Sequence, residues 1–385
     1  EAVLAGFVYV SCGCRGRSSV DEKGVFCGKA PVSVADLKAG IRFLKRNASV
    51  LPGNMERIIS VGISAGGAMS TLLGCTGDCA DYEEEWKEMG ADLTQSDQIF
   101  GAQCYCPISD LDHADFAYEW MFEGQTHYTG MPFVGFGEGN LSPFAQSLSR
   151  KMGEKYVEYF NSLELKNPDT GELLKIAKDH GGNGSAWLKK QLEKAADKYV
   201  TKFPEKRQEL EQYSWLRFKD GKTCISSINE MEQDYHKRLK LCPAFDDLDL
   251  IQAENQEFGT SGIDKRHFNT QLAGIMEDLK EEYPGETARY LPGYKKICGD
   301  KELARQKRLL NPLNYIGKEK TAPYYRIRVG AKDADTSLTV TMILALKLME
   351  CGKTNVDYEI VWNEVHGRAD YPGEMVEWVR SIYAI

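Results

Sequence analysis

Arg57-Ile-Ile-Ser-Val-Gly-Ile-Ser64-Ala-Gly-Gly67 is the stretch that decides the fold, because it joins a β-branched run to a Gly-x-Ser-x-Gly element. The next residues, Ala68-Met-Ser-Thr-Leu-Leu73, are typical of a helix. A serine on a sharp strand-to-helix turn needs small residues two positions before and after it, because its backbone is strained. The pattern therefore predicts a nucleophile elbow with Ser64 as an acyl-transfer nucleophile. An ordinary strand-to-helix turn is the alternative.

The composition is typical of a globular protein. Of the 385 residues, 42% are hydrophobic and 27% are charged, and the formal net charge is −9. An acidic chain offers no electrostatic footprint for nucleic acid or anionic lipid, and it has no apolar run of about eighteen residues that would span a bilayer. We therefore expect neither nucleic acid nor a membrane as a partner. The length predicts one large core with an insertion, or two domains.

The eleven cysteines are odd in number and scattered along the chain, which favours reduced thiols. The Cys-x-x-Cys spacing of zinc sites is absent, so we expect no metal and no cofactor. Reduced thiols favour the cytoplasm over export, with a local Cys75–Cys79 disulfide left open. The chain begins at Glu1 without an initiator Met, so we expect a fragment. Further N-terminal strands, and any signal peptide that would direct export, would precede it.

Strands and helices alternate in the first 110 residues and again after residue 315, an order that predicts a mostly parallel sheet with helices on both faces. The expected strands are Phe7–Ser11, Arg57–Val61, Ile99–Cys106, Tyr324–Val329 and Val356–Trp362. We therefore predict that residues 1–110 and 316–385 form one α/β core.

The sequence pattern changes between residues 111 and 315, where few stretches are typical of β-strands. Long charged helices are expected at Phe144–Leu163 and Ser185–Phe203, and Gly- and Asn-rich connectors join them. Charge-rich stretches here are most simply solvated helix surfaces. We therefore predict that residues 111–315 form a helical insertion in the core.

The acid and the base that would serve Ser64 are expected in loops just after the last two strands. His366 follows the final strand, and its near-neutral pKa suits it to take the serine proton and return it to the leaving group. A carboxylate on the other ring nitrogen fixes the tautomer. Asp333, after the preceding strand, is our choice for this role, and Asp335 and Asp110 compete with it. The other histidines lie in the insertion and are interpreted as structural or surface residues: His113, His127, His180, His236 and His267.

An oxyanion hole needs two N–H donors. The backbone N–H of Ala65, which follows the nucleophile, is the first. The second commonly comes from a His-Gly-Gly loop after an earlier strand, and no such sequence precedes Ser64. We therefore expect that donor upstream of Glu1.

Four patches of the sequence resemble the bacterial tannases (tannin acyl hydrolases), a family of the α/β-hydrolase superfamily. They are Gly62-Ile-Ser64-Ala-Gly-Gly67; Tyr105-Cys-Pro-Ile-Ser-Asp110 with Ala114-Asp-Phe-Ala-Tyr-Glu-Trp120; Cys242-Pro-Ala-Phe-Asp246 with Glu254-Asn-Gln-Glu-Phe-Gly259; and Gly330-Ala-Lys-Asp333-Ala-Asp335-Thr-Ser337 with His366. The serine patch is shared with many esterases and peptidases. The patches in the insertion are what favour tannases.

The resemblance implies an α/β-hydrolase fold with residues 111–315 as a lid, and hydrolysis of galloyl esters by Ser64, Asp333 and His366. A small phenolic ester is then the expected partner, and the oligomeric state is left open.

The resemblance further implies that Lys240, Glu254 and Asp335 hydrogen-bond the ring hydroxyls of gallate. A ring without hydroxyls would leave these charges unpaired when buried. Plain surface charge is the alternative for Lys240, which lies beside Lys237 and Arg238.

Two other functions stay open. A feruloyl esterase or general carboxylesterase would keep the triad and lose its dependence on Glu254 and Asp335. A non-catalytic protein that binds phenolic ligands would keep Ser64 only for the turn.

Overall fold

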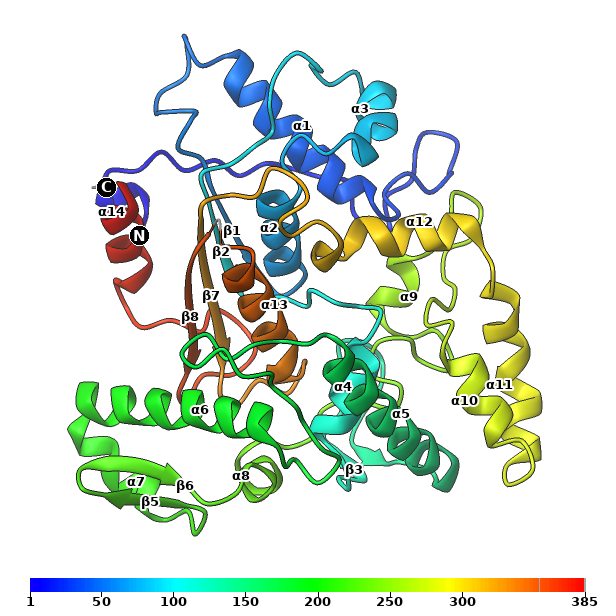
Figure 1. Cartoon of the computed structure of the whole chain (residues 1–385). Helices are drawn as coiled ribbons and strands as arrows, with labels where there is room; N and C mark the ends of the chain where they lie inside the picture. The colour runs from blue at the N-terminus through cyan, green and yellow to red at the C-terminus, as the bar shows by residue number, and fades with distance from the viewer. Residues whose placement is uncertain (353, 384–385) are drawn as a thin grey trace.

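The computed structural model describes residues 1–352 and 354–383 and contains a four-stranded parallel sheet (Figure 1). The strands are β1 (Ile59–Ile63), β2 (Gly101–Tyr105), β7 (Tyr324–Gly330) and β8 (Asn355–Val361), in the spatial order β1-β2-β7-β8. Every residue of β2 is buried, as expected for a central strand covered on both faces. The parallel order brings the carboxyl ends of all four strands to one edge of the sheet, where the loops with Ser64, Asp333 and His366 lie.

Helices cover both faces of this sheet, as the alternation predicted. On one face lie α1 (Val32–Arg46), α2 (Ala65–Cys75) and α13 (Leu338–Glu350), whose apolar residues share one core cluster with those of β2 and β7. On the other face, α14 (Glu374–Tyr383) packs Trp378 against Ile59 and Tyr324. A short helix, α3 (Glu83–Met89), stands in the acidic stretch that precedes β2.

The predicted strand Phe7–Ser11 is wrong. These residues form no strand, and Val8, Tyr9 and Val10 are exposed. An apolar run becomes a strand only where a neighbour supplies a hydrogen-bonded ladder, and β1 is the edge of the described sheet. Two apolar side chains of β1, Val61 and Ile63, are 54% and 45% exposed.

Between residues 111 and 315 the chain is mainly helical. Its helices are α4 (Ala114–Met121), α5 (Pro143–Ser162), α6 (Asn183–Lys202), α7 (Arg207–Glu211), α8 (Ile228–Tyr235), α9 (Ala253–Glu257), α10 (Leu272–Asp278), α11 (Pro284–Ile297) and α12 (Lys301–Leu310). Its strands form two small antiparallel pairs, β3 (His127–Tyr128) with β4 (Gly139–Asn140) and β5 (Leu216–Lys219) with β6 (Lys222–Ile225). The boundaries at residues 110 and 316 stay a prediction.

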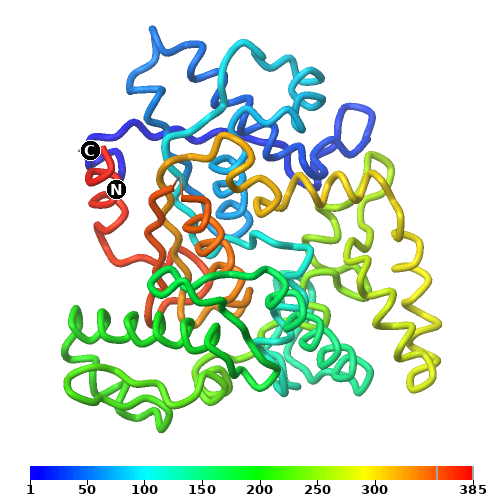
Figure 2. The backbone as a smooth tube through the Cα atoms, viewed as in Figure 1, coloured from blue at the N-terminus to red at the C-terminus, as the bar shows by residue number. Residues whose placement is uncertain are grey.

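In Figure 2 the helical region, coloured green to yellow, lies below and to the right of the core, whereas the N- and C-termini lie beside each other at the left. One apolar cluster joins the two parts: Trp120 and Leu148 of the helical region belong to it together with Val329 and Trp362 at the ends of β7 and β8. The helical region is therefore packed against the sheet edge at which the parallel strands end.

In the described residues, no helix is both long and apolar enough to cross a membrane. All eleven cysteines are free thiols, so the disulfide left open between Cys75 and Cys79 is not formed.

Candidate active site

Ser64 occupies a sharp turn between β1 and α2. Its backbone has φ 58° and ψ −122°, a conformation that is costly for a residue with a side chain. The turn is held at both ends, because the N–H of Ser64 donates to Tyr105 O (3.0 Å) and the N–H of Ala68 donates to Ser64 O (2.9 Å). The serine is thus presented at the carboxyl end of β1, as a nucleophile elbow requires.

Two glycines make this turn sterically feasible. A Cβ atom at Gly62 would lie 1.9 Å from the carbonyl oxygen of Gly66, and one at Gly67 would lie 2.4 Å from that of Tyr105. No L side chain fits at such distances without a backbone shift. Close contact between backbone segments therefore explains Gly62 and Gly67, whereas a Cβ at Gly66, two positions after Ser64, would meet nothing within 4 Å.

His366 and Asp333 form a hydrogen-bonded pair. His366 Nδ1 lies 2.9 and 2.8 Å from the two carboxylate oxygens of Asp333. These residues follow β8 and β7, which are adjacent parallel strands, so their loops meet. Asp333 is fully buried, whereas the side chain of His366 is 16% exposed. Burial disfavours the imidazolium, but hydrogen bonds to Asp333 and Cys106 outweigh burial and raise the pKa of His366 above its usual value.

The hydroxyl of Ser64 makes no hydrogen bond within the part of the chain that the structure describes. His366 Nε2 instead faces the thiol of Cys106, with 3.8 Å between Sγ and Nε2. Cys106 directly follows Tyr105, the residue whose carbonyl binds the Ser64 N–H. Serine, thiol and imidazole are therefore on neighbouring loops. In unliganded hydrolases the serine–histidine bond is often long and tightens when substrate binds.

Among the three carboxylates considered for the orienting role, only Asp333 contacts His366 within the described residues. Asp110 is engaged by His113 Nδ1 (3.2 Å) and by the side-chain amide of Asn311 (3.0 Å). Asp335 uses its N–H to donate to Asp333 Oδ1 (3.0 Å).

One histidine of the helical region does reach this loop. His236 Nε2 hydrogen-bonds the backbone carbonyl of Asp333. Burial lowers the pKa of His236 to about 4, so the ring is neutral and donates its proton to the carbonyl. No local pattern marks this residue, because its partner lies 97 positions away in the sequence.

Lys240 and Asp335 are brought together, with 3.6 Å between Nζ and the nearer carboxylate oxygen. Lys240 is 3% exposed, so it is not a solvent-facing charge, and its ammonium also lies 4.0 Å from the ring centroid of Phe245. Glu254 is half-buried on α9, and within the described residues it forms no hydrogen bond or ion pair with Lys240 or Asp335. Its charge acts instead on Glu257. Burial raises the pKa of Glu257 to about 7, and the negative charge of Glu254 adds to this rise.

A buried network positions Lys240. Arg238 and Glu119, both fully buried, form an ion pair of 2.6 Å, and Arg238 Nε donates to the carbonyl of Lys240 (2.9 Å). The hydroxyl of Tyr118 accepts the N–H of Lys240 (3.0 Å) and donates to the carbonyl of Ala334 (3.0 Å). The segment that carries Lys240 is therefore tied directly to the loop that carries Asp333.

Ala65 is the first residue of α2 and is exposed. The first N–H groups of a helix have no acceptor inside the helix, and the helix dipole favours negative charge at this end. The N–H of Ala65 is thus suited to an oxyanion formed at Ser64.

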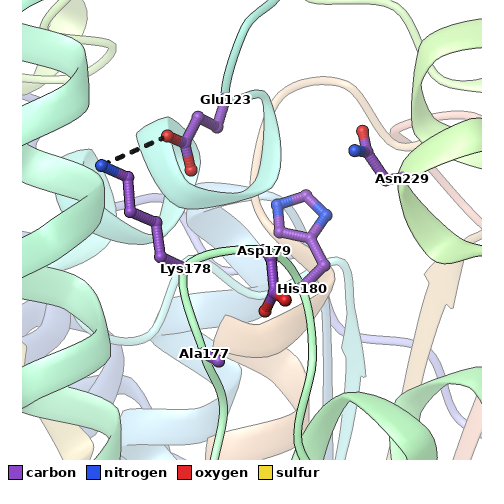
Figure 3. Close-up of a pocket in the computed structure, with 6 residues that line it drawn as sticks. All are labelled: Glu123, Ala177, Lys178, Asp179, His180 and Asn229. Carbon is purple, nitrogen blue, oxygen red and sulfur yellow. Dashed lines mark ion pairs between the residues drawn. The ribbon is translucent and has the colours of Figure 1, made fainter.

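A separate cavity of about 520 Å³ is shown in Figure 3 and is lined by Glu123, Ala177, Lys178, Asp179, His180 and Asn229. Lys178 points toward Glu123 across 3.9 Å, and His180 Nδ1 lies 2.9 Å from buried Glu232. None of its lining residues belongs to the Ser64 site, and none is a serine or cysteine nucleophile.

Comparisons with known proteins agree with this fold. The BD-FAE family model matches residues 18–114. The crystal structure of Fusobacterium nucleatum tannase is 33% identical, with a TM-score of 0.80 over 96% of this chain and 77% of that chain. The tannin acyl hydrolase from Lactobacillus plantarum is 32% identical, with a TM-score of 0.81 over 96% and 75%. A tannin acyl hydrolase in complex with ethyl gallate is 30% identical, with a TM-score of 0.80 over 97% and 75%.

No curated protein matches the chain. The structural matches, together with the parallel sheet and its helices on both faces, show an α/β-hydrolase fold. The predicted fold class is confirmed.

Proposed function

Because the chain belongs to the bacterial tannase family of ester hydrolases, we propose that it hydrolyses galloyl and related phenolic acid esters through Ser64, His366 and Asp333. One observation carries the proposal: a histidine–carboxylate pair and a serine in a strained turn stand at the carboxyl ends of strands of the same parallel sheet.

The reaction follows from the chemistry of these groups. Ser64 Oγ attacks the ester carbonyl while neutral His366 accepts the serine proton at Nε2 and then gives it to the leaving alcohol. Asp333 holds the imidazole in the productive tautomer and stabilises its charged form. The N–H of Ala65 stabilises the oxyanion, and water then hydrolyses the acyl-enzyme by the reverse sequence of proton transfers.

In this proposal the helical region, with residues 111–315 acting as a lid, supplies the acyl-group specificity together with the loop that follows β7. The carboxylate of Asp335 accepts hydrogen bonds from ring hydroxyls, and the ammonium of Lys240 donates to them. Glu254 is the third member of the set, and substrate binding brings it to the ring. Related tannin acyl hydrolases have been solved with ethyl gallate and with 3,4-dihydroxybenzoate, which both carry adjacent ring hydroxyls.

The test is the release of free acid from methyl gallate and methyl ferulate by the protein and by its Ser64→Ala variant. We expect gallate release that disappears in the variant, while circular dichroism shows an unchanged fold. Ser64-dependent release from ferulate alone would keep the triad and reject the roles of Lys240, Glu254 and Asp335, as for a feruloyl esterase. Binding of gallate without Ser64-dependent release from either ester would identify a binding protein.

A further inference from the structure

The thiol of Cys106 is held facing the imidazole of His366. Cys106 is the first residue after β2, its φ of 38° is in the left-handed region, and its N–H donates to the carbonyl of Arg328 (2.7 Å). The thiol lies 3.8 Å from His366 Nε2 and 3.3 Å from the carbonyl of Gly367, and Cys106 is fully buried. The backbone therefore fixes the direction of the sulfur.

This pair belongs to a larger cluster of ligand atoms. In the described part of the chain, one group of three such side chains brings its ligand atoms within 4.8 Å of one another: Cys106, Asp333 and His366. Asp333 hydrogen-bonds Nδ1 of the ring whose Nε2 faces the thiol. A carboxylate behind a histidine in this way is the usual outer partner that orients a metal-binding imidazole.

The distance between the two inner atoms suits a tetrahedral ion. Zinc lies about 2.3 Å from a thiolate sulfur and about 2.0–2.1 Å from an imidazole nitrogen. An ion bonded to both spans 3.8 Å when the sulfur–metal–nitrogen angle is roughly 120°, close to the tetrahedral value. Thiolate and imidazole together favour zinc-like ions over magnesium or calcium, which prefer oxygen ligands.

We propose that Cys106 Sγ and His366 Nε2 bind Zn²⁺ or Cd²⁺, with Asp333 as the outer carboxylate, and that the ion reversibly inhibits the hydrolase. On binding, the S–H bond of Cys106 breaks and its proton leaves to solvent, while the lone pair on neutral Nε2 forms the second metal bond. No electron is transferred. Water fills the remaining positions, so the ion exchanges more readily than one in a closed four-ligand site.

Inhibition, unlike binding, rests on the proposed function. The metal takes the same lone pair on His366 that would accept the proton of Ser64. Both ligands must be deprotonated, so affinity for the ion rises with pH. The absence of zinc-ligand spacing led to the sequence expectation of no metal, but these two ligands lie 260 positions apart and meet only in the fold.

The first arm of the test measures binding without any activity readout. Cd²⁺ is titrated into the full chain carrying Cys12→Ser, Cys14→Ser, Cys224→Ser and Cys298→Ser, which removes the exposed thiols that would also bind it. We expect about one equivalent of thiolate-to-metal absorption, lost when Cys106→Ser is added and weakened at least tenfold by His366→Gln. Absorption that survives Cys106→Ser, or none in the parent protein at millimolar Cd²⁺, would overturn the site.

Two variants keep the binding test decisive if one of them does not fold. If Cys106→Ser does not fold, His366→Gln removes the other ligand and leaves the thiol in place, so the tenfold weakening still decides the outcome.

The second arm measures the Zn²⁺ concentration that halves hydrolysis of methyl gallate, relative to each variant's own metal-free rate. We expect this concentration to rise at least tenfold in Cys106→Ser and a chelator to restore the parent's activity. Cd²⁺ absorption at Cys106 without inhibition would overturn the inhibitory role and count against His366 as the base. A failure of the metal site and a failure of the proposed function therefore give different results.

Discussion

The two sides of the candidate site are held in place by different means. On the sheet side, Ser64, Asp333 and His366 each follow a parallel strand, so backbone geometry sets where they stand. On the helical side, Lys240 is positioned by side chains, above all by the buried pair of Arg238 and Glu119. Positions set by backbone depend on short local sequences, whereas positions set by a buried network depend on residues far along the chain.

The difference has an energetic consequence. Changes on the sheet side should act mainly on the reaction rate, because the strands themselves are stabilised elsewhere in the core. Changes in the buried network should act mainly on stability, because removal of one partner leaves a charge uncompensated in an apolar interior. Each of the following expectations tests one half of this comparison.

The largest effect is expected from Asp333→Asn. Without the carboxylate, His366 loses its orienting partner and the stabilisation of its charged form, and kcat for methyl gallate should fall by about 10⁴-fold. The measurement is kcat and KM, with thermal unfolding as the control for structure. A loss below tenfold would transfer the orienting role to another carboxylate.

Arg238→Met should come next, through stability. It leaves Glu119 buried without its partner, which should lower the free energy of unfolding by about 3–5 kcal/mol. Urea unfolding gives the value, and the exposed i,i+3 pair of Lys206 and Glu209 supplies the control, since Lys206→Met should leave the unfolding midpoint unchanged. Equal midpoints for the two variants would mean that the network does not support the helical side.

Gly62→Ala should impair the rate more than the stability. The added Cβ would lie 1.9 Å from Gly66 O, so the turn must shift, and a misplaced nucleophile should cost about 10²-fold in kcat. Gly66→Ala is the matched control, because nothing lies within 4 Å of a Cβ there. Comparable kcat values for both variants would show that the turn tolerates the clash.

Lys240→Met should lower kcat/KM for methyl gallate by about 10- to 100-fold, the worth of hydrogen bonds to a charged group. Methyl benzoate, which lacks ring hydroxyls, should be affected far less. Lys237→Met, three residues away and exposed, should behave like the parent protein. If both esters lost activity equally, Lys240 would be supporting the fold and not recognising the ring.

The smallest effect is a displacement of the pH profile. Only neutral His366 can accept the serine proton. Because its pKa is raised, the midpoint of the rise of activity with pH should lie above pH 6.5, the pKa of an ordinary imidazole. Because Cys106 adds to the rise, Cys106→Ala should move the acid limb of kcat/KM to lower pH. An acid limb of kcat/KM with its midpoint at pH 6.5 in the parent protein, or the same midpoint in parent and variant, would contradict this assignment.

The sequence predicted the sheet side well, because its signals are local. The glycines around Ser64 and the apolar runs of β2, β7 and β8 each occupy a few consecutive residues. The predicted ends of the strands differ from the observed ones by up to two residues. The strand predicted at Arg57–Val61 is observed at Ile59–Ile63, the residues that pair with β2. Only the family resemblance pointed to Lys240 and Glu254. The structure brings Lys240 close to Asp335, whereas Glu254 makes no such contact within the described residues.

Local sequence was thus sufficient for the turn at Ser64, the parallel order of the core and the places of Asp333 and His366, because steric limits and strand periodicity act over neighbouring residues. Tertiary contacts settled the rest. The run at residues 7–11 found no strand partner, His236 reached the carbonyl of Asp333, and Cys106 came to face His366. Such contacts join residues up to 260 positions apart, and burial and hydrogen-bond pairing between distant segments form only when the whole chain has folded.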